Sequence, residues 1–353
     1  MKIVIFGLTI SSAWGNGHAT LWRGLCRALA GRGHDVTFYE RDVPYYAANR
    51  DLLDPPGCRL RLYDDWDTVA AEAAREAAGA TVAMVTSYCP DAIEACSLVV
   101  GSRAELRVFY DLDTPVTLSH VNSGRRVSYV PAEGFRDFDL VLSYTGGRAL
   151  DELRTRLGAR RVAPLYGSVD PDAHRRVPVS SGRRADLSYL GTYAADRQDR
   201  LERLFVEPAR RRPARRFVLG GSQYPEDFPW TPNMFYVWHT PPPAHPEFYC
   251  SSLLTLNVTR GAMADMGYCP SGRIFEAAAC GTPILTDEWE GLSAFYEPGE
   301  EILVARSTDD ALDALELSEA ELARIADAAR ERTLSEHTAS CRAGELERIL
   351  EAV

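Results

Sequence analysis

Short, nearly continuous apolar runs alternate with amphipathic segments along the first half of the chain. A run at residues 2–7 is followed by a segment in which Leu21, Leu25 and Leu29 fall on one stripe, and then by a second run at residues 35–40. Continuous apolar runs are typical of strands covered on both faces, and the stripe is typical of a helix packed on a sheet. The pattern predicts a βαβ unit.

Further runs of the same kind predict parallel sheets in both halves of the chain. In the first half the predicted strands are residues 2–7, 35–40, 81–87, 106–113, 139–145 and 161–167. In the second half they are residues 186–192, 216–221, 234–240, 253–260, 283–287 and 301–305, and the end of the chain is helical. We therefore expect an α/β protein with two doubly wound halves.

A polar stretch at residues 168–185 separates the two halves. It shows no periodicity, as expected of a linker, so we predict domains at residues 1–167 and 186–338 with a hinge between them. The chain has 353 residues and 46% hydrophobic content, which is enough for two cores.

Charge and cysteine content narrow the class of protein. A net charge of -11 argues against a nucleic-acid or membrane-surface partner. The N-terminus lacks the pattern of a signal peptide, and no apolar run reaches the length of a membrane span, so we expect a cytoplasmic protein with no integral membrane segment. The eight cysteines include no CxxC pair and no zinc-spaced cluster, which predicts free thiols.

The loop WGNGHAT, residues 14–20, lies between the first predicted strand and helix, where α/β proteins bind ligands. With Glu40 at the end of the second strand it suggests a dinucleotide site. Thr20 replaces the third glycine, however, and Gly15 lies about eight residues beyond the strand, which is too far for a phosphate held at the helix N-terminus. A nicotinamide oxidoreductase and a plain surface loop are the weaker alternatives.

The most informative segment is PSGRIFEAAACGTPILTD, residues 270–287. Ser271 and Gly272 open a predicted helix, whose free N–H groups suit a phosphate, and Arg273 adds charge in its first turn. Glu276 lies one turn further along an otherwise apolar helix. Its carboxylate can accept two hydrogen bonds from a ribose diol, and the alternative is an ordinary glutamate on a helix surface.

The run FEAAACGTPILTD resembles the donor-binding signature of GT-B glycosyltransferases. Together with TLNVTR, GTYAADRQ, DEWEGLSAFYEPGEEILVA and the N-terminal WGNGHATLWRGL, the match is most similar to the CgeB-like group of bacterial glycosyltransferases of group 1 type. The resemblance implies the GT-B fold, in which two Rossmann-like domains face each other across a cleft. It implies an acceptor side at residues 1–167, a donor side at 186–338, and a last helix at 339–353 that packs back on the N-terminal domain.

The same resemblance implies a set of donor-binding residues at matching positions. Glu276 takes the ribose hydroxyls, and Ser271 and Arg273 take the diphosphate. The other donor contacts that it implies are Gly272, Arg197, Asn257, Arg260, Gly221, Ser222 and His239, with Gly15 and Gly17 close to the diphosphate. Retaining members commonly carry a second Glu eight positions before the first; this chain has Tyr268 there, and its nearest acid is Asp265.

Glycosyl transfer mainly requires stabilisation of the negative charge on the departing diphosphate. Arg197, Arg260 and Arg273 and the N-terminus of the predicted helix at Ser271 are suited to this. No run of acids is placed for Mg²⁺, so we predict no metal and no cofactor beyond the donor substrate. His18 or Asp113 is the candidate general base of an inverting enzyme. Retention, in which the departing phosphate takes the proton, is favoured by the resemblance. Trp14, Tyr88 and Asp111 are the predicted acceptor contacts.

The expected partners are a nucleotide-sugar donor and an acceptor that is a small molecule, a lipid-linked group, a protein or a glycan. A homodimer is one possible assembly. Two alternatives to a transferase share the fold: a nucleotide-sugar 2-epimerase, and a non-catalytic sugar-nucleotide-binding or spore-coat-type protein. His34, His174, His245 and His337 are predicted to be loop or surface residues.

Overall fold

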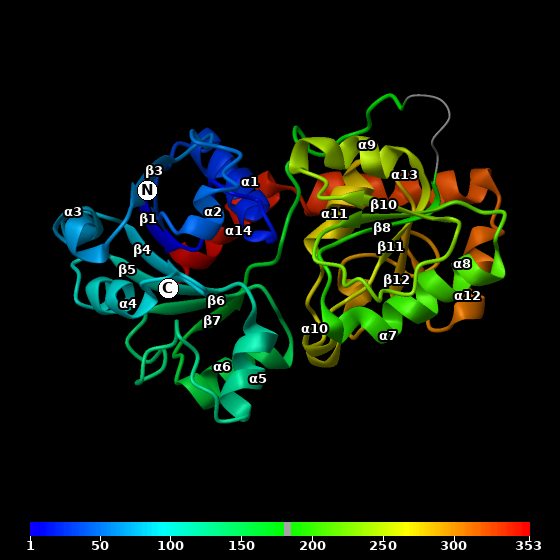
Figure 1. Cartoon of the computed structure of the whole chain (residues 1–353). Helices are drawn as coiled ribbons and strands as arrows, with labels where there is room; N and C mark the ends of the chain where they lie inside the picture. Colours follow the sequence, from blue (N-terminus) through cyan, green and yellow to red (C-terminus); the bar gives the residue numbers. More distant parts are fainter. Residues whose placement is uncertain (180–184) are drawn as a thin grey trace. The chain divides into compact units, whose positions relative to one another are not determined.

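A computed structural model describes residues 1–179 and 185–353 of the chain. Residues 180–184 belong to the predicted linker 168–185 and lie outside the described residues. The chain forms two compact units, which we call unit 1 and unit 2 (Figure 1). Unit 1 combines Met1–Gly167 with Ala339–Val353, and unit 2 is the continuous segment Ser168–Thr338.

Unit 1 is built around a seven-stranded parallel sheet with the strand order β3-β2-β1-β4-β5-β6-β7. Its strands are β1 (Lys2–Gly7), β2 (Asp35–Arg41), β3 (Arg59–Tyr63), β4 (Val82–Thr86), β5 (Leu106–Asp111), β6 (Leu140–Ser143) and β7 (Val162–Pro164). From β1 to β3 the chain adds strands on one side of β1, and from β4 onward it adds them on the other side, so the direction of winding reverses between β1 and β4. In doubly wound sheets, ligands bind outside the carboxyl ends of the strands at such a point.

The helices of unit 1 come from both ends of the chain. They are α1 (His18–Gly31), α2 (Pro44–Ala47), α3 (Trp66–Ala78), α4 (Ala92–Val100), α5 (Thr114–Asn122), α6 (Arg148–Leu157) and α14 (Ala339–Glu351). Leu346 and Leu350 of α14 join the core formed by Trp22 and Leu25 of α1 and by the strands. The last helix is thus part of the core of unit 1.

A cluster of charged side chains lies beside the contact between α1 and α14. Glu347 of α14 pairs with Arg32 and accepts a hydrogen bond from Nε2 of His34 across 2.6 Å. The bonds from Arg32 and His34 lower the pKa of Glu347 to about 2. The cluster is at the surface, so packing of the apolar face contributes more to the docking of α14 than this exposed pairing does.

Unit 2 contains a six-stranded parallel sheet with the order β10-β9-β8-β11-β12-β13. Its strands are β8 (Ala185–Leu190), β9 (Phe217–Gly221), β10 (Met234–Trp238), β11 (Ser252–Asn257), β12 (Ile284–Asp287) and β13 (Leu303–Ala305). The order reverses between β8 and β11, so the loops after these two strands lie at the switch point of the sheet.

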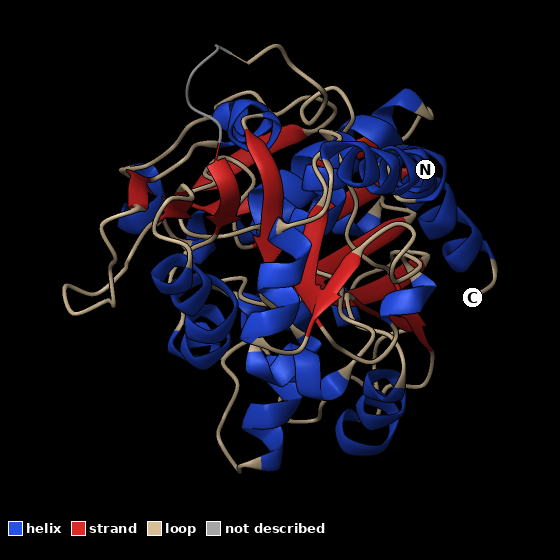
Figure 2. Cartoon of the chain, turned by 90° about the vertical axis from the view of Figure 1, so that its right-hand side faces the viewer, coloured by secondary structure: helices blue, strands red, loops and turns tan. Residues whose placement is uncertain are grey.

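Helices cover both faces of the second sheet (Figures 1 and 2). In Figure 1, α9, α11 and α13 lie on one face, and α7, α8 and α12 lie on the other. The helical elements are η1 (Ala195–Arg197), α7 (Gln198–Leu201), η2 (Glu202–Val206), α8 (Glu207–Arg211), η3 (Pro242–Ala244), α9 (His245–Cys250), α10 (Gly261–Met266), α11 (Gly272–Ala279), η4 (Leu292–Ala294), α12 (Thr308–Leu315) and α13 (Glu319–Glu336).

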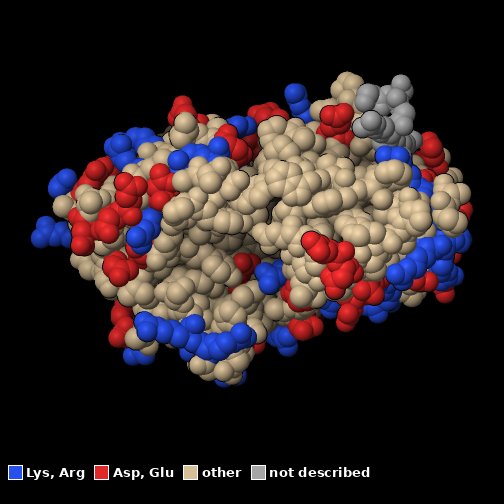
Figure 3. Space-filling model, in the orientation of Figure 1, with Lys and Arg blue, Asp and Glu red and all other residues tan. Residues whose placement is uncertain are grey.

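The predicted fold class is confirmed, since each predicted strand has its counterpart in one of the two parallel sheets. Strand β3 was not predicted; it is an edge strand whose apolar residues alternate with Arg59 and Arg61. On the face of each unit that Figure 3 shows, both basic and acidic side chains are present. Among the described residues, no helix is long and apolar enough to cross a membrane.

Candidate active site

Helix α11 presents a single accessible face. Ile274, Phe275 and the three alanines at 277–279 are buried, whereas Ser271, Gly272, Arg273 and Glu276 are partly exposed. Ser271 is the N-cap residue, and no side chain caps the helix. Free N–H groups of the first turn, a guanidinium and a carboxylate therefore lie on the same side, where the helix dipole favours an anion.

Arg273 connects the start of α11 with the strands at the switch point. Its Nη1 donates a hydrogen bond to Oδ1 of Asn257, at the end of β11, across 2.9 Å. Its guanidinium carbon lies 5.3 Å from the ring centroid of Tyr189 in β8. A Cβ atom added to Gly191 would stand 2.9 Å from Nη2 of Arg273. A glycine is therefore needed there for the arginine to occupy this position.

A second hydrogen bond fixes the side chain of Asn257, whose Nδ2 donates to Oγ1 of Thr286 across 2.9 Å. Only 1% of its surface is exposed. The amide is therefore fixed in one orientation, with its oxygen toward Arg273.

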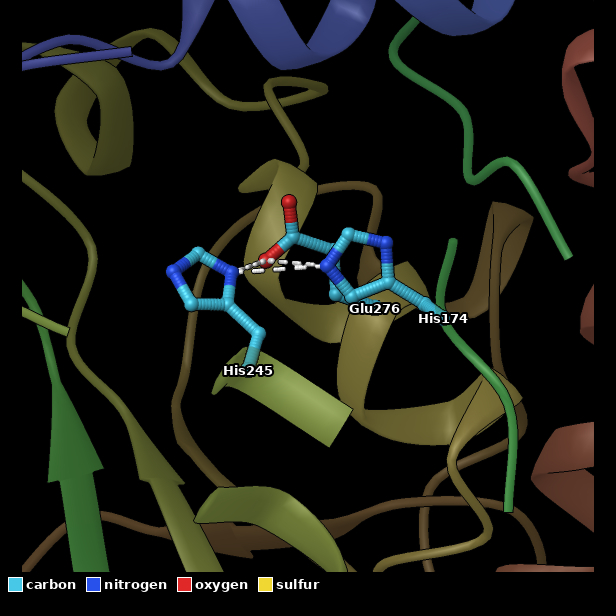
Figure 4. Close-up of side chains that lie close together, drawn as sticks. All are labelled: His174, His245 and Glu276. Carbon is cyan, nitrogen blue, oxygen red and sulfur yellow. Dashed lines mark hydrogen bonds and ion pairs between the residues drawn. The ribbon is translucent and has the colours of Figure 1, made fainter. Parts of the chain in front are cut away.

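Glu276 lies between two imidazole rings (Figure 4). Its Oε2 is 3.6 Å from Nδ1 of His245 and 3.9 Å from Nε2 of His174, and it accepts a hydrogen bond from Tyr249 at 3.4 Å. Figure 4 shows the other oxygen, Oε1, pointing away from both rings. Burial opposes ionisation, but His174, His245 and Arg273 together lower the pKa of Glu276 to about 2. The carboxylate is thus ionised, with one oxygen directed away from the histidines.

The loops after β8 and β11 bring two further predicted arginines to the same end of the sheet. Nη2 of Arg197 donates to the carbonyl of Thr192 across 2.7 Å, while its Nε is buried without a hydrogen-bond partner among the described residues. Nε of Arg260 donates to Oδ2 of Asp196 across 3.3 Å. Arg260 is therefore partly neutralised by a neighbouring acid.

Three further predicted donor contacts, Gly221, Ser222 and His239, lie at the ends of β9 and β10. Gly221 has φ of 143°, and an added Cβ would stand 2.0 Å from the carbonyl oxygen of Gly191. Ser222 is 5% exposed, and the N–H of His239 donates to the carbonyl of Gly221 across 2.8 Å. The backbones of these loops thus approach each other closely, which only a glycine at 221 permits.

Unit 1 gathers most of the predicted catalytic and acceptor residues at its own switch point. Nε2 of His18 is 3.9 Å from Oδ2 of Asp113, and the rings of His18 and Tyr88 are 5.8 Å apart. Asp111, fully buried at the end of β5, accepts a hydrogen bond at Oδ1 from the N–H of Asp113. Burial raises the pKa of Asp111 to about 6. The distance between His18 and Asp113 is too long for a hydrogen bond.

The WGNGHAT loop is ordered by its own asparagine. Oδ1 of Asn16 accepts hydrogen bonds from the N–H groups of His18 and Ala19, at 3.0 and 3.3 Å, so it caps the start of α1. Gly15 has φ of 67°, and no atom lies within 4 Å of a Cβ added to Gly17. The side chain of Trp14 is partly exposed in the same loop.

His174 and His337 lie in bends outside the helices and strands, as predicted for loop residues, but neither is at the surface. His174 is 1% exposed and faces Glu276, and His337 is 4% exposed against Phe275. Glu40 has no free oxygen for a ribose: its two oxygens accept bonds from the loop after β1, at Thr9, Ile10 and Ser11. It holds that loop in place, which removes the acid on which the dinucleotide interpretation depended.

Sequence reasoning also missed the residues that surround Glu276 and Arg273. Tyr189 and Tyr249 fall inside apolar runs, where they carry no signal of their own, and His245 follows a proline-rich loop. All eight cysteines are free thiols, as predicted.

Comparison with known proteins gives the class. Residues 197–348 match the family model described as glycosyl transferase-like. No curated protein sequence matches the chain. Sucrose-phosphate synthase from Thermosynechococcus elongatus superposes with a TM-score of 0.71 at 15% identity, covering 99% of both chains. HepE from Anabaena, in complex with UDP and glucose, gives 0.70 at 11% identity over 100% of both chains.

An α-glucosyltransferase in complex with UDP and a mismatched DNA gives a TM-score of 0.67 at 13% identity, covering 99% of both chains. At these identities the likeness shows the fold, which is GT-B. The matched segment 197–348 contains α11, the loop after β11 and Arg197. The protein is therefore an enzyme of the glycosyltransferase class.

Proposed function

We propose that this enzyme transfers a sugar from a nucleoside diphosphate sugar to an acceptor hydroxyl or similar nucleophile, with retention and without a metal at the diphosphate. Among glycosyltransferases, its motifs favour the CgeB-like group. The single observation that carries the proposal is the accessible face of α11, on which an uncapped N-terminus, Arg273 and Glu276 follow one another within two turns. This is the order in which a diphosphate and a ribose follow one another in the donor.

Each group on this face has a chemical task. The first-turn N–H groups and Arg273 stabilise the charge that develops on the diphosphate as the glycosidic bond breaks. Oε1 of Glu276 accepts the ribose hydroxyls, while Oε2 stays with the histidines. Arg197 and Arg260 add positive charge from the neighbouring loops. This charge stabilises the departing diphosphate, as a metal ion does in other transferases.

The donor tested first is a uridine diphosphate sugar, because two structural neighbours were solved with UDP. We place the acceptor at the switch point of unit 1, where Tyr88, Asp111 and Asp113 lie near His18. In a retaining reaction the departing phosphate takes the acceptor proton, and His18 then orients a hydroxyl. An inverting reaction would use His18 or Asp113 as the base.

The test combines binding with turnover. Thermal shifts are measured with UDP, GDP, dTDP and NAD⁺, and hydrolysis of UDP-glucose and related donors is followed by NMR, which reports the anomer released. We expect stabilisation by one nucleoside diphosphate, slow donor hydrolysis with retention, and no change in rate with added Mg²⁺. Stabilisation by NAD⁺ alone, or binding without any turnover, would overturn the proposal.

A matched pair of variants ties the effect to the site. Glu276→Gln removes the negative charge from the ribose acceptor and is expected to weaken nucleotide binding at least tenfold, about 1.4 kcal/mol. Glu331→Gln changes an exposed glutamate on α13 and should leave binding unchanged. A 2-epimerase would instead convert one nucleotide sugar into another without releasing free sugar, which the same NMR spectra reveal.

A further inference from the structure

His174, His245 and Glu276 form the one cluster among the described residues in which three metal-ligating side chains converge. One ligand atom from each lies within 4.8 Å of the others. Nε2 of His174 and Nδ1 of His245 are 3.4 Å apart, and their distances to Oε2 of Glu276 are 3.9 and 3.6 Å. Figure 4 shows both rings edge-on to the same oxygen.

The separations are close to those around a tetrahedral ion. Zn²⁺ binds histidine nitrogen and carboxylate oxygen at about 2.0–2.1 Å, so neighbouring ligands of a tetrahedral site are roughly 3.3 Å apart. The sides of the triangle formed by these three atoms are 3.4, 3.6 and 3.9 Å, so the longest is about 0.6 Å wider than in such a site. Contraction of that size lies within the reach of side-chain rotation.

The hydrogen bond on the far side of His245 fixes which nitrogen faces the cluster as a ligand. Its Nε2 lies 3.1 Å from the carbonyl oxygen of Thr240. A carbonyl oxygen only accepts, so Nε2 donates to Thr240, and Nδ1 is the nitrogen that faces Glu276. A metal-bound histidine usually donates its other N–H to a carbonyl or carboxylate in this way.

The two ring nitrogens and Oε2 of Glu276 converge on one point, where contacts of 3.4, 3.6 and 3.9 Å link them. The side chains of Glu276 and His245 are each 15% exposed, so the cluster is largely shielded but remains accessible to an ion.

We propose that His174, His245 and Oε2 of Glu276 bind a divalent transition-metal cation of the Zn²⁺ class. Two histidines and one glutamate form a ligand set of zinc sites, with further positions left for water. The nitrogen ligands favour Zn²⁺, Co²⁺ or Ni²⁺ over Mg²⁺. The inference shares Glu276 with the proposed function, and Oε1 stays directed away from the cation, toward the ribose.

Equilibrium dialysis of the full chain against Zn²⁺, with metal analysis of the protein, tests this proposal. We expect one tightly bound equivalent, which Mg²⁺ does not displace, and visible absorption bands of a low-coordinate site when Co²⁺ replaces Zn²⁺. His174→Gln and His245→Gln should each weaken binding by more than tenfold. His120→Gln, a histidine change on α5 outside the cluster, is the matched control.

Circular dichroism and the midpoint of thermal unfolding, measured without metal, establish that each variant is folded. Binding that is absent, or that is unaffected by both cluster variants, overturns the metal site. UDP binding measured on the same samples separates the two proposals. Zn²⁺ binding without a response to any nucleotide would refute the proposed function alone, and a nucleotide response without Zn²⁺ binding would refute the metal site alone.

Discussion

Arg273 and Asn257 are joined by a hydrogen bond of 2.9 Å between Nη1 of the arginine and Oδ1 of the amide. The amide oxygen accepts from the guanidinium, and the buried Nδ2 group donates to Thr286. A flexible cationic side chain at the start of α11 is therefore held on a rigid strand end. Such pre-organisation lowers the entropy cost of binding a phosphate group.

Arg273→Lys should weaken nucleotide binding although it keeps the positive charge. A lysine has no planar fork with which to bond Asn257 and a phosphate oxygen at the same time. We expect the dissociation constant of UDP to rise at least about tenfold in isothermal titration calorimetry. Arg210→Lys on α8, where the arginine is exposed, is the control, and equal affinities of the two variants would contradict the role given to Arg273.

Gly191→Ala should impair donor binding more than folding. The new Cβ would stand 2.9 Å from Nη2 of Arg273 and 3.0 Å from the hydroxyl of Tyr189. The end of the arginine side chain can move away at low cost, but it then leaves its place beside Asn257. We expect weaker UDP binding with a small change in thermal midpoint. Gly79→Ala, whose Cβ meets nothing closer than 3.8 Å, should change neither quantity.

Gly17→Ala tests whether the WGNGHAT loop approaches the donor. No atom of the chain lies within 4 Å of the added Cβ, and the residue has φ of -93°, so stability should fall by less than about 1 kcal/mol. If the loop backbone contacts the diphosphate, kcat/KM should nevertheless fall at least tenfold. Gly31→Ala in α1 has equal space and serves as the reference. An unchanged kcat/KM would remove Gly17 from the donor contacts.

Asp111→Asn should change how stability depends on pH. The folded-state pKa of Asp111 is about 6, above its ordinary value of 3.8, because the carboxyl is buried. Between these values the unfolded chain ionises while the folded chain keeps its proton. The stability of the native protein relative to the variant should therefore fall by up to about 3 kcal/mol as pH rises from 4 to 7. Urea unfolding across this range measures it; a constant difference would contradict the burial effect.

Leu346→Ala should destabilise unit 1. Leu346 lies in α14, which belongs to unit 1 although it is separated in sequence from the rest of that unit. The side chain is 2% exposed and packs in the core that α14 shares with α1. Truncation leaves a cavity and should cost about 2–4 kcal/mol of unfolding free energy. Leu53→Ala, at a leucine that is 70% exposed, provides the comparison. A loss below 1 kcal/mol would mean that α14 contributes little to this core.

The strands and their parallel arrangement could be predicted because both faces of each sheet are covered, so the runs are continuously apolar. The edge strand β3 escaped this criterion, since Arg59 and Arg61 alternate with its apolar residues. The accessible polar face of α11 was also predictable, because Arg273 and Glu276 are the polar residues of an otherwise apolar, alanine-rich helix.

The surroundings of Glu276 could not be predicted in the same way. His174 and His245 are 71 residues apart in sequence and meet only because both pack near α11. A single histidine in a loop carries no periodic signal, so its burial depends on tertiary contacts. Glu40 fits a ligand-binding motif in the sequence, but in the structure its carboxylate accepts hydrogen bonds from the loop after β1.

The return of α14 to unit 1 has a practical consequence for dissecting the enzyme. Unit 2 is one uninterrupted stretch of polypeptide, inserted between Gly167 and Ala339 of its neighbour. It can therefore be expressed alone as one continuous segment, in which the proposed nucleotide binding can be measured separately. Unit 1 can be obtained separately only by splicing the last helix back onto its main body.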